Sequence, residues 1–226
     1  MGEPELDASI MDGSNLMAGA VAGVTSVKNP ITLARLVKDS TKHVLLKGRG
    51  AEAFAYEMGI DKAEVEYFLT PKTRKKREER LQKIHKMGTV GCVAMDMNRN
   101  IAAGTSTGGM DKKKFGRIGD SPIIGAGTYA KNTTCGVSCT GHGEYFIKNA
   151  VAYDMSALIE YKGLSAIPAA EQIINEKLLG QKASGGLISI DYNGEIAISF
   201  NTAGMFWAYQ NESGRRVGMF ETDEKY

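Results

Sequence analysis

The chain has 226 residues, of which 42% are hydrophobic and 24% are charged, and its formal net charge at pH 7 is +2. This length suits one domain with a substantial core, and the balanced charge gives no argument for a nucleic-acid partner. No apolar run approaches the length of a membrane span. The first residues also lack the apolar core of a secretory signal. Together, these observations lead us to expect a cytoplasmic protein with neither a membrane nor a nucleic-acid partner.

The first part of the chain predicts a β-hairpin followed by two helices. Residues 5–13 are typical of a strand that ends in an Asp-Gly-Ser-Asn turn, and the small residues of 18–24 predict its partner. A helix follows, with Asn29 as its N-cap and Pro30 in its first turn. Residues 43–46 predict a short buried strand, and we expect a second helix to start at Gly48 and end at Gly59.

Residues 61–88 contain mostly charged side chains and too few apolar ones to form a packed element. We interpret this segment as a mobile, solvated linker. A nucleic-acid contact is the alternative, because basic runs bind phosphate. The acidic pair Glu78 and Glu79 interrupts the basic patch, and no aromatic residues interleave with it, which favours the linker.

The second half of the chain predicts strands, then helices, then strands. The expected strands are 90–95, 101–105, 125–129, 135–139, 185–190 and 196–200, and the expected helices are 144–161 and 167–179. This order indicates an α+β fold in which helices pack on antiparallel sheet. Cys135 and Cys139 are expected on one side of their strand as small core residues. The three cysteines and three histidines do not have the spacing of a metal site.

The linker ends at Gly88-Thr89, where an alternating apolar run begins. Cleavage of the Gly88–Thr89 bond would give Thr89 a free α-amine beside its hydroxyl, so that one residue would hold both the nucleophile and its base. An isolated Gly-Thr-Val-Gly is more often a glycine turn that enters a strand. The motifs that follow favour the cleavage site.

Four motifs follow Thr89 in order: Thr-Ser-Thr-Gly-Gly at 105–109, Gly-Arg-Ile-Gly-Asp-Ser-Pro at 116–122, Gly-Ala-Gly at 125–127 and Cys-Thr-Gly-His-Gly-Glu at 139–144. With Gly88-Thr89 they closely resemble the plant-type L-asparaginase and isoaspartyl peptidase family of N-terminal-nucleophile hydrolases. The resemblance extends from about residue 5 to residue 220. It implies a four-layer αββα sandwich, a single domain over 1–226 that is cut into an α part, 1–88, and a β part, 89–226.

The resemblance also implies catalytic roles. Thr89 is the expected nucleophile, and Thr107 matches the threonine that hydrogen-bonds it. Thr140 and Gly141 match the donors that stabilise the oxyanion. For Thr107 the alternative is a threonine at a strand end, where this residue type is common.

A second group of residues is expected to bind the substrate. Arg117 matches the residue that binds the α-carboxylate and Asp120 the one that binds the α-amine; the alternative is a surface ion pair between them in a glycine turn. His142 is expected to act as a pocket wall. The remaining pocket residues implied by the resemblance are Ile118, Gly119, Thr140, Gly141 and Gly143.

The implied activity is hydrolysis of L-asparagine to aspartate and ammonia, and cleavage of β-aspartyl dipeptides, by a homodimer of αβ units. No cofactor is expected, and a structural monovalent cation is left open. Glycosylasparaginases share several of these segments but carry His-Asp-Thr-Ile at the cleavage site. This chain has Met87-Gly88-Thr89-Val90 there, which favours the asparaginases.

Members of the family begin with a strand that ends in a His-Gly-Gly-Ala-Gly-like turn, whereas this chain begins at the Glu-Leu-Asp-Ala strand that comes later. We therefore expect an exposed strand edge near the site. Two interpretations follow. The residues belong to a longer gene product, or the chain is a truncated, non-catalytic remnant with a structural or interaction role.

Overall fold

The computed structural model describes residues 4–68, 88–110 and 113–220. Most of the linker predicted at 61–88 therefore lies outside the described residues; the part inside them includes a short helix, α3 (Val65–Phe68). Within the described ranges, no helix is long and apolar enough to cross a membrane.

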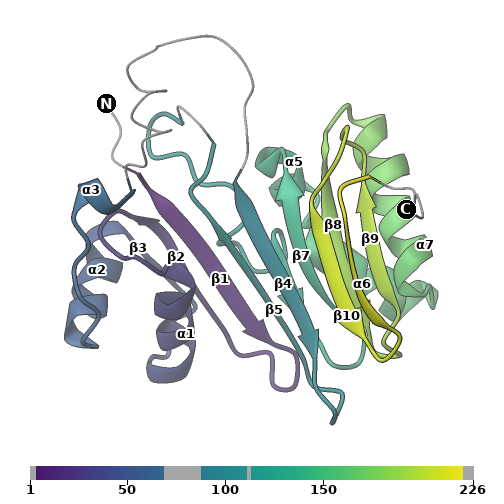
Figure 1. Ribbon diagram of the computed structural model, residues 1–226, viewed down its shortest axis with the longest axis horizontal. Coiled ribbons are helices and arrows are strands. Elements are labelled where there is room, and N and C mark those ends of the chain that lie inside the picture. Colours follow the sequence, from purple (N-terminus) through teal and green to yellow (C-terminus); the bar gives the residue numbers. More distant parts are fainter. Residues whose placement is uncertain (1–3, 69–87, 111–112, 221–226) are drawn as a thin grey trace.

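The first sheet has five strands in the order β3-β2-β1-β5-β4 (Figure 1). Its strands are β1 (Leu6–Asp12), β2 (Ala18–Val24), β3 (Leu45–Lys47), β4 (Thr89–Met95) and β5 (Ile101–Thr107). All neighbours are antiparallel except β2 and β3, which are parallel. The predicted hairpin of β1 and β2 is confirmed. The prediction of a buried strand at 43–46 is wrong, because β3 is a three-residue edge strand and Leu45 is 48% exposed.

Helices α1 (Pro30–Ser40) and α2 (Gly48–Glu57) cover the outer face of this sheet. Pro30 opens α1 as predicted, but the Asn29 side chain makes no capping hydrogen bond. Each fully buried aliphatic side chain contributes about 1.5–3 kcal/mol, which holds the helices on the sheet. The buried residues of this layer are Ala8, Val21, Val24, Val27, Leu33, Ala34, Val37, Ala51 and Ala55.

The second sheet is antiparallel and has the order β6-β7-β8-β9. Its strands are β6 (Thr128–Ala130), β7 (Cys135–Gly141), β8 (Gly185–Asp191) and β9 (Ile196–Phe200). The strand predicted at 125–129 starts later than expected, because residues 125–127 form a turn in which the Gly127 N–H donates to the Ile123 carbonyl over 3.1 Å.

Helices α5 (Gly143–Lys148), α6 (Val151–Lys162) and α7 (Ala166–Glu171) cover the outer face of the second sheet, and α7 continues into the π-helical segment η1 (Gln172–Leu178). The prediction of one helix at 144–161 is wrong, because Ala150 takes a left-handed conformation (φ 47°) and separates α5 from α6. Cys135 and Cys139 lie in this core as predicted, packed with Phe146, Met155 and Leu187.

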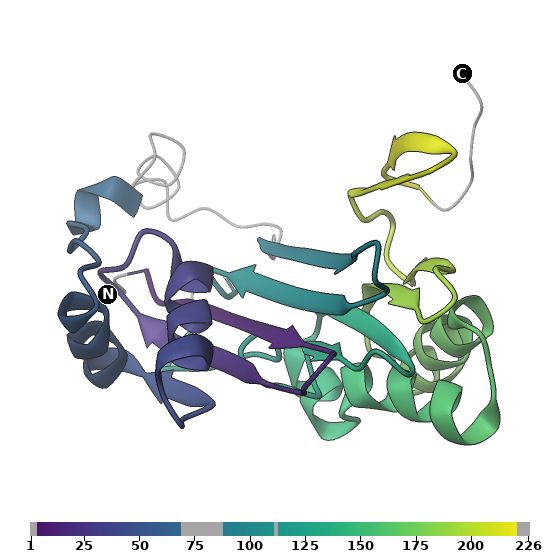
Figure 2. The same cartoon turned by 90° about the horizontal axis from the view of Figure 1, so that it is seen from below.

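A further hairpin outside the two sheets, β10 (Trp207–Asn211) and β11 (Gly214–Gly218), was not predicted from the sequence. Its polar and glycine residues interrupt the apolar alternation, so that the pattern of a strand is weak. The rings of Trp207 and Tyr209 stack with their centroids 6.0 Å apart. Figure 2 shows the hairpin standing off from the second sheet, and an open hollow lined by Ile196, Ile198, Trp207 and Tyr209 lies between it and β9.

Candidate active site

Two close contacts fix how β4 lies against β7 across the space between the sheets. A Cβ on Gly91 would overlap the Ser138 hydroxyl, so this glycine allows the two strands to approach. A Cβ on Gly136 would lie 2.5 Å from Val93 Cγ1. From the first contact to the second, the contacting residue moves two positions forward in β4 and two positions back in β7. The strands therefore run in opposite directions and face each other with alternate residues.

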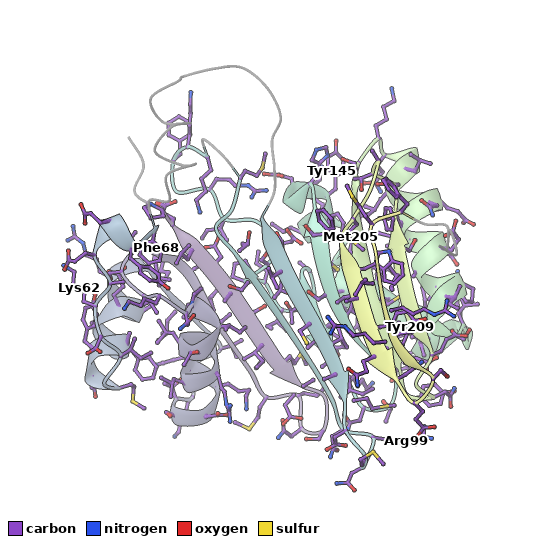
Figure 3. All side chains as sticks on the ribbon, in the orientation of Figure 1. Lys62, Phe68, Arg99, Tyr145, Met205 and Tyr209 are labelled. Atoms are coloured by element: carbon purple, nitrogen blue, oxygen red, sulfur yellow. The ribbon has the colours of Figure 1, made fainter. Side chains whose placement is uncertain are left out.

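One further step along both strands places Thr89 opposite Thr140. Figure 1 shows the same arrangement, since the start of β4 and the end of β7 lie at one end of the molecule. In Figure 3, Tyr145 of α5 marks this end and Arg99, in the turn after β4, marks the opposite one. This register leads us to infer that two threonines 51 positions apart in the sequence face each other.

The Thr89 side chain meets Thr107, its partner in the β4–β5 ladder. The Thr89 hydroxyl donates to the Thr107 hydroxyl oxygen over 3.2 Å. Thr107 is 7% exposed, and its oxygen also accepts the Gly109 N–H at 3.0 Å. Thr89 is half-buried and Gly88 is exposed, so the hydroxyl is held in place while the preceding peptide bond faces open space.

A row of buried hydroxyl groups lies behind these threonines. The oxygen–oxygen distances are 2.6 Å from Ser138 to Thr105, 2.6 Å from Thr105 to Thr128 and 2.8 Å from Thr128 to Ser9, and Ser9 donates to the Ser121 carbonyl over 2.6 Å. Buried polar groups are costly unless they are hydrogen-bonded. The row therefore ties β7, β5, β6 and β1 together and ends at the residue that follows Asp120.

Asp120 is buried, and its Oδ2 has no hydrogen-bond partner among the described residues. Burial raises the pKa of Asp120 to about 6, an effect opposed by the positive charge of Arg117 and assisted by the negative charge of Glu144. A Cβ on Gly143 would lie 2.9 Å from Asp120 Oδ1. The carboxylate can therefore accept a charged donor from a ligand that reaches it.

Arg117 also lies against Gly143, since a Cβ on Gly143 would be 2.8 Å from Arg117 Nη2. Its Nε and Nη2 each donate to Glu144 over 2.9 Å, and this pairing raises the pKa of Arg117. The alternative of a surface ion pair between Arg117 and Asp120 is wrong, because Arg117 pairs with Glu144 and Asp120 is buried.

The corner between β7 and α5 carries the other predicted residues. A Cβ on Gly141 would overlap the Phe146 ring and lie 2.7 Å from the Ser184 carbonyl, so a side chain does not fit. His142 is exposed, and its Nδ1 accepts the Ser184 N–H over 3.4 Å, which holds the ring at the surface. Ile118 is partly exposed, and Gly119 is buried against the Arg117 guanidinium.

Asp7 and Lys113 are two charged residues that the sequence reasoning missed. Asp7 is fully buried, is the ladder neighbour of Thr107 in β1, and has its pKa raised by burial. Lys113 Nζ lies 3.6 Å from Asp7 Oδ2 and belongs to the loop that carries Arg117. An aspartate between two apolar residues of the strand, Leu6 and Ala8, was the signal that could have revealed this anchor.

The described residues hold no cluster of three or more histidine, cysteine, aspartate or glutamate side chains arranged to bind a metal ion. Burial raises the pKa of the Cys135 thiol to about 12 and that of Cys139 as well. A thiol with a raised pKa is a poor nucleophile at neutral pH. These two cysteines therefore act as core residues.

The family model described as "Asparaginase" matches residues 1–219 of the chain. The chain is 47% identical over 225 residues to a protein named isoaspartyl peptidase from Escherichia coli strain K12, which covers 92% of this chain and 70% of that relative. It is 43% identical to the probable isoaspartyl peptidase/L-asparaginase 2 of Arabidopsis thaliana, over 94% of this chain and 74% of the relative. The isoaspartyl peptidase/L-asparaginase of Mus musculus is 44% identical, over 96% and 69%.

Proposed function

The chain belongs to the asparaginase family of enzymes, and we propose that it is a self-processing threonine amidohydrolase. Its proposed reactions are the hydrolysis of L-asparagine to aspartate and ammonia, and the cleavage of β-aspartyl dipeptides. The names of the relatives support both substrate classes. The observation that carries the proposal is the Thr89 hydroxyl, held 3.2 Å from Thr107 at the start of an edge strand.

Processing starts at the peptide bond before Thr89. The Thr89 hydroxyl attacks the Gly88 carbonyl carbon, and the C–N bond breaks as the proton passes to the nitrogen, leaving an ester and a free α-amine. Water then hydrolyses the ester. The products are the α part, 1–88, and the β part, 89–226. Gly88 is exposed, and among the described residues no atom beyond its chain neighbours lies within 4 Å of the place a Cβ would occupy, which supports room for this step.

The mature site then works with one residue as nucleophile and base. The Thr89 amine takes the hydroxyl proton, and the oxygen attacks the side-chain amide carbon of asparagine. The negative oxygen that develops is stabilised by the Thr140 hydroxyl and the Gly141 N–H, an effect worth roughly 3–4 kcal/mol for each donor in other enzymes. Ammonia leaves with a proton from the amine, and water activated by the same amine hydrolyses the β-aspartyl ester on Thr89.

Substrate binding falls to the charged groups beside Gly143. Arg117 takes the α-carboxylate and Asp120 the α-ammonium, which together select an aspartyl group. Ile118, Gly119, His142 and Gly143 form the surrounding wall. Asp120 Oδ2, which has no hydrogen-bond partner in the described part of the chain, supports this role, because a buried carboxylate gains most from a charged donor.

The proposal also includes the four-layer αββα arrangement, the homodimer of αβ units and the absence of a cofactor requirement. The layer order is supported by α1 and α2 on the first sheet and α6 and α7 on the second. A structural monovalent cation stays an open part of the proposal.

The test is intact-mass analysis and denaturing electrophoresis after days at neutral pH, on the parent, Thr89→Ala and Thr133→Ala. Thr133 is an exposed threonine outside the site and serves as the control. The parent and the control should give two fragments that divide at Gly88–Thr89, and Thr89→Ala should stay whole. Assays with asparagine, a β-aspartyl dipeptide and N-acetylglucosaminyl-asparagine follow.

A single uncut band in all three proteins would contradict self-processing and favour the non-catalytic remnant. Cleavage accompanied by activity on N-acetylglucosaminyl-asparagine alone would favour a glycosylasparaginase instead.

A further inference from the structure

We propose that Glu144 is a positioning residue that holds the Arg117 guanidinium by one edge and leaves the other edge free for the substrate α-carboxylate. This inference rests on the proposed function, because it concerns how the same site recognises its substrate. Glu144 was not among the residues singled out from the sequence.

The first step is the geometry of the pair. A guanidinium has five N–H donors in a planar fork, which a carboxylate can engage along either of two edges. Glu144 engages the side edge, since Oε1 accepts from Nε and Oε2 from Nη2, both over 2.9 Å. Such a two-point contact fixes the plane of the ring as well as its position.

The second step is what remains of the fork. One N–H on Nη2 and both on Nη1 have no acceptor among the described residues. The free N–H on Nη2 and one of the two on Nη1 form the end edge of the guanidinium, which is the other edge that a carboxylate can engage. The two edges are coplanar, so the contact with Glu144 fixes the direction of the free edge as well as that of the bound edge.

The third step is where the free edge lies. A Cβ added to Gly119 would lie 2.7 Å from Arg117 Nη1, and a Cβ added to Gly143 would lie 2.8 Å from Arg117 Nη2. Asp120 Oδ1 is 2.9 Å from the same point on Gly143. The missing side chain of Gly143 thus allows Arg117 Nη2 and the buried carboxylate of Asp120 to lie close to the same point.

The exposure of the two partners separates this pair from an ordinary surface ion pair. The Arg117 side chain is 21% exposed and that of Glu144 is 57% exposed. The Arg117 guanidinium needs a fixed orientation to face a ligand, because without one it would turn towards the buried carboxylate of Asp120. Glu144 supplies this orientation as an acceptor on the solvent side of Arg117. The pair therefore matters less for folding than for the direction of the guanidinium.

A competing interpretation makes the opposite prediction. If Glu144 occupied the place of the substrate carboxylate, removing its charge would tighten binding. The kinetic test is Glu144→Gln, with Glu160→Gln as the matched control, because Glu160 also pairs with a cation, Lys131, over 2.6 Å but outside the site.

We expect Glu144→Gln to raise KM for L-asparagine roughly tenfold with kcat within about twofold, because a charge-assisted, two-point contact is lost. Inhibition by L-aspartate should weaken to the same extent. Inhibition by β-alanine, which lacks the α-carboxylate, should not change. Glu160→Gln should match the parent in every measurement, and both variants should melt within a few degrees of it.

An unchanged KM in Glu144→Gln would overturn the inference, and so would a lower KM, which would identify Glu144 as a competitor. A loss of kcat alone, or equal weakening of L-aspartate and β-alanine, would also overturn it. If Glu144→Gln does not fold, Glu144→Asp carries the test: it keeps the charge at a shorter reach, and its KM should rise without a loss of kcat.

Failure of the proposed function has a different signature, which is a parent protein without turnover. The inference is then decided by calorimetric titration with L-aspartate, in which Glu144→Gln should bind roughly tenfold more weakly than the parent. A parent that neither turns over asparagine nor binds L-aspartate would overturn both.

Discussion

Strands β4 and β7 carry the two halves of the proposed chemistry at one end of the molecule, but their surroundings differ. β4 is an edge strand of the first sheet, and its outward residues Val90, Cys92 and Ala94 are exposed. β7 lies between β6 and β8, and every residue except Thr140 is buried. The inward faces of the two strands are in close contact, since Gly91 and Gly136 each lie against the other strand.

The contrast indicates how one site can combine an accessible backbone at the nucleophile with rigid oxyanion donors. A nucleophile that must first be freed from the preceding residue needs an accessible backbone, which an edge strand offers. Donors that stabilise an oxyanion work best when they do not move, and a strand buried on both faces offers that. The predictions below test this contrast, from the largest expected effect to the smallest.

The largest effect is expected at the rigid end of β7. In Gly141→Ala the new methyl would overlap the Phe146 ring and lie 2.8 Å from the Gly185 Cα, so the backbone of β7 or β8 must shift. The free energy of unfolding should fall by about 3 kcal/mol or more, measured by urea denaturation.

The matched control is Gly180→Ala, because among the described residues no atom beyond its own helix backbone and chain neighbours lies within 4 Å of its missing Cβ, and its φ is not positive. Its stability should stay within about 0.5 kcal/mol of the parent. Equal stability of the two variants would show that β7 ends in looser packing than the structure describes.

The next effect concerns the inward face that β4 shares with β7. Gly91→Ala should cost about 1–3 kcal/mol, because its methyl would overlap the Ser138 side chain. In a Ser138→Gly background the same substitution should cost close to nothing. The double-mutant cycle, measured by denaturation, checks the register that places Thr89 opposite Thr140; additive costs would contradict that register.

A pair of cysteines compares the outward faces of the two strands. Cys139→Ser puts a hydroxyl into the apolar core of β7 and should cost about 1–3 kcal/mol. Cys92→Ser, on the exposed face of β4, should change stability by less than about 0.5 kcal/mol. Thermal melting of the two variants decides it, and similar losses in both would mean that the outer face of β4 is covered in solution.

The smallest effect is a dependence on pH near the end of β7. Because the pKa of Asp120 is about 6, the carboxylate that would bind the substrate ammonium is ionised above that pH and neutral below it. The value of kcat/KM for L-asparagine should therefore fall up to about tenfold for each pH unit below 6.

Asp120→Asn should remove the Asp120 contribution, so that the profile falls less steeply below pH 6, and it should raise KM at neutral pH. The same raised pKa makes the free energy of unfolding fall as pH rises from the ordinary aspartate value of 3.8 towards 6, because the unfolded chain releases the proton first. A profile below pH 6 that is equally steep in Asp120→Asn would assign the fall to another group.

Local pattern was enough for the elements whose residues alternate strongly. The β1–β2 hairpin, β4, β5, β8 and β9 were all predicted near their observed bounds, and Pro30 marked the start of α1. Pattern failed at Ala150, where helical spacing continues across a residue in a left-handed conformation, and at β3, where a short apolar run turned out to be an exposed edge. In both places the chain geometry is set by neighbours that the pattern does not contain.

For the candidate site, the sequence by itself determined the residue types and their order: Gly88-Thr89 at a strand start, Thr107 at a strand end, Arg117 and Asp120 in a glycine loop. Only the tertiary structure decided their partners. The Thr89–Thr107 contact depends on the β4–β5 register, and the Arg117–Glu144 contact joins a loop to a helix 27 positions away. A sequence pattern indicates which face of an element a residue prefers. Long-range register depends on side-chain packing, to which all of the elements contribute.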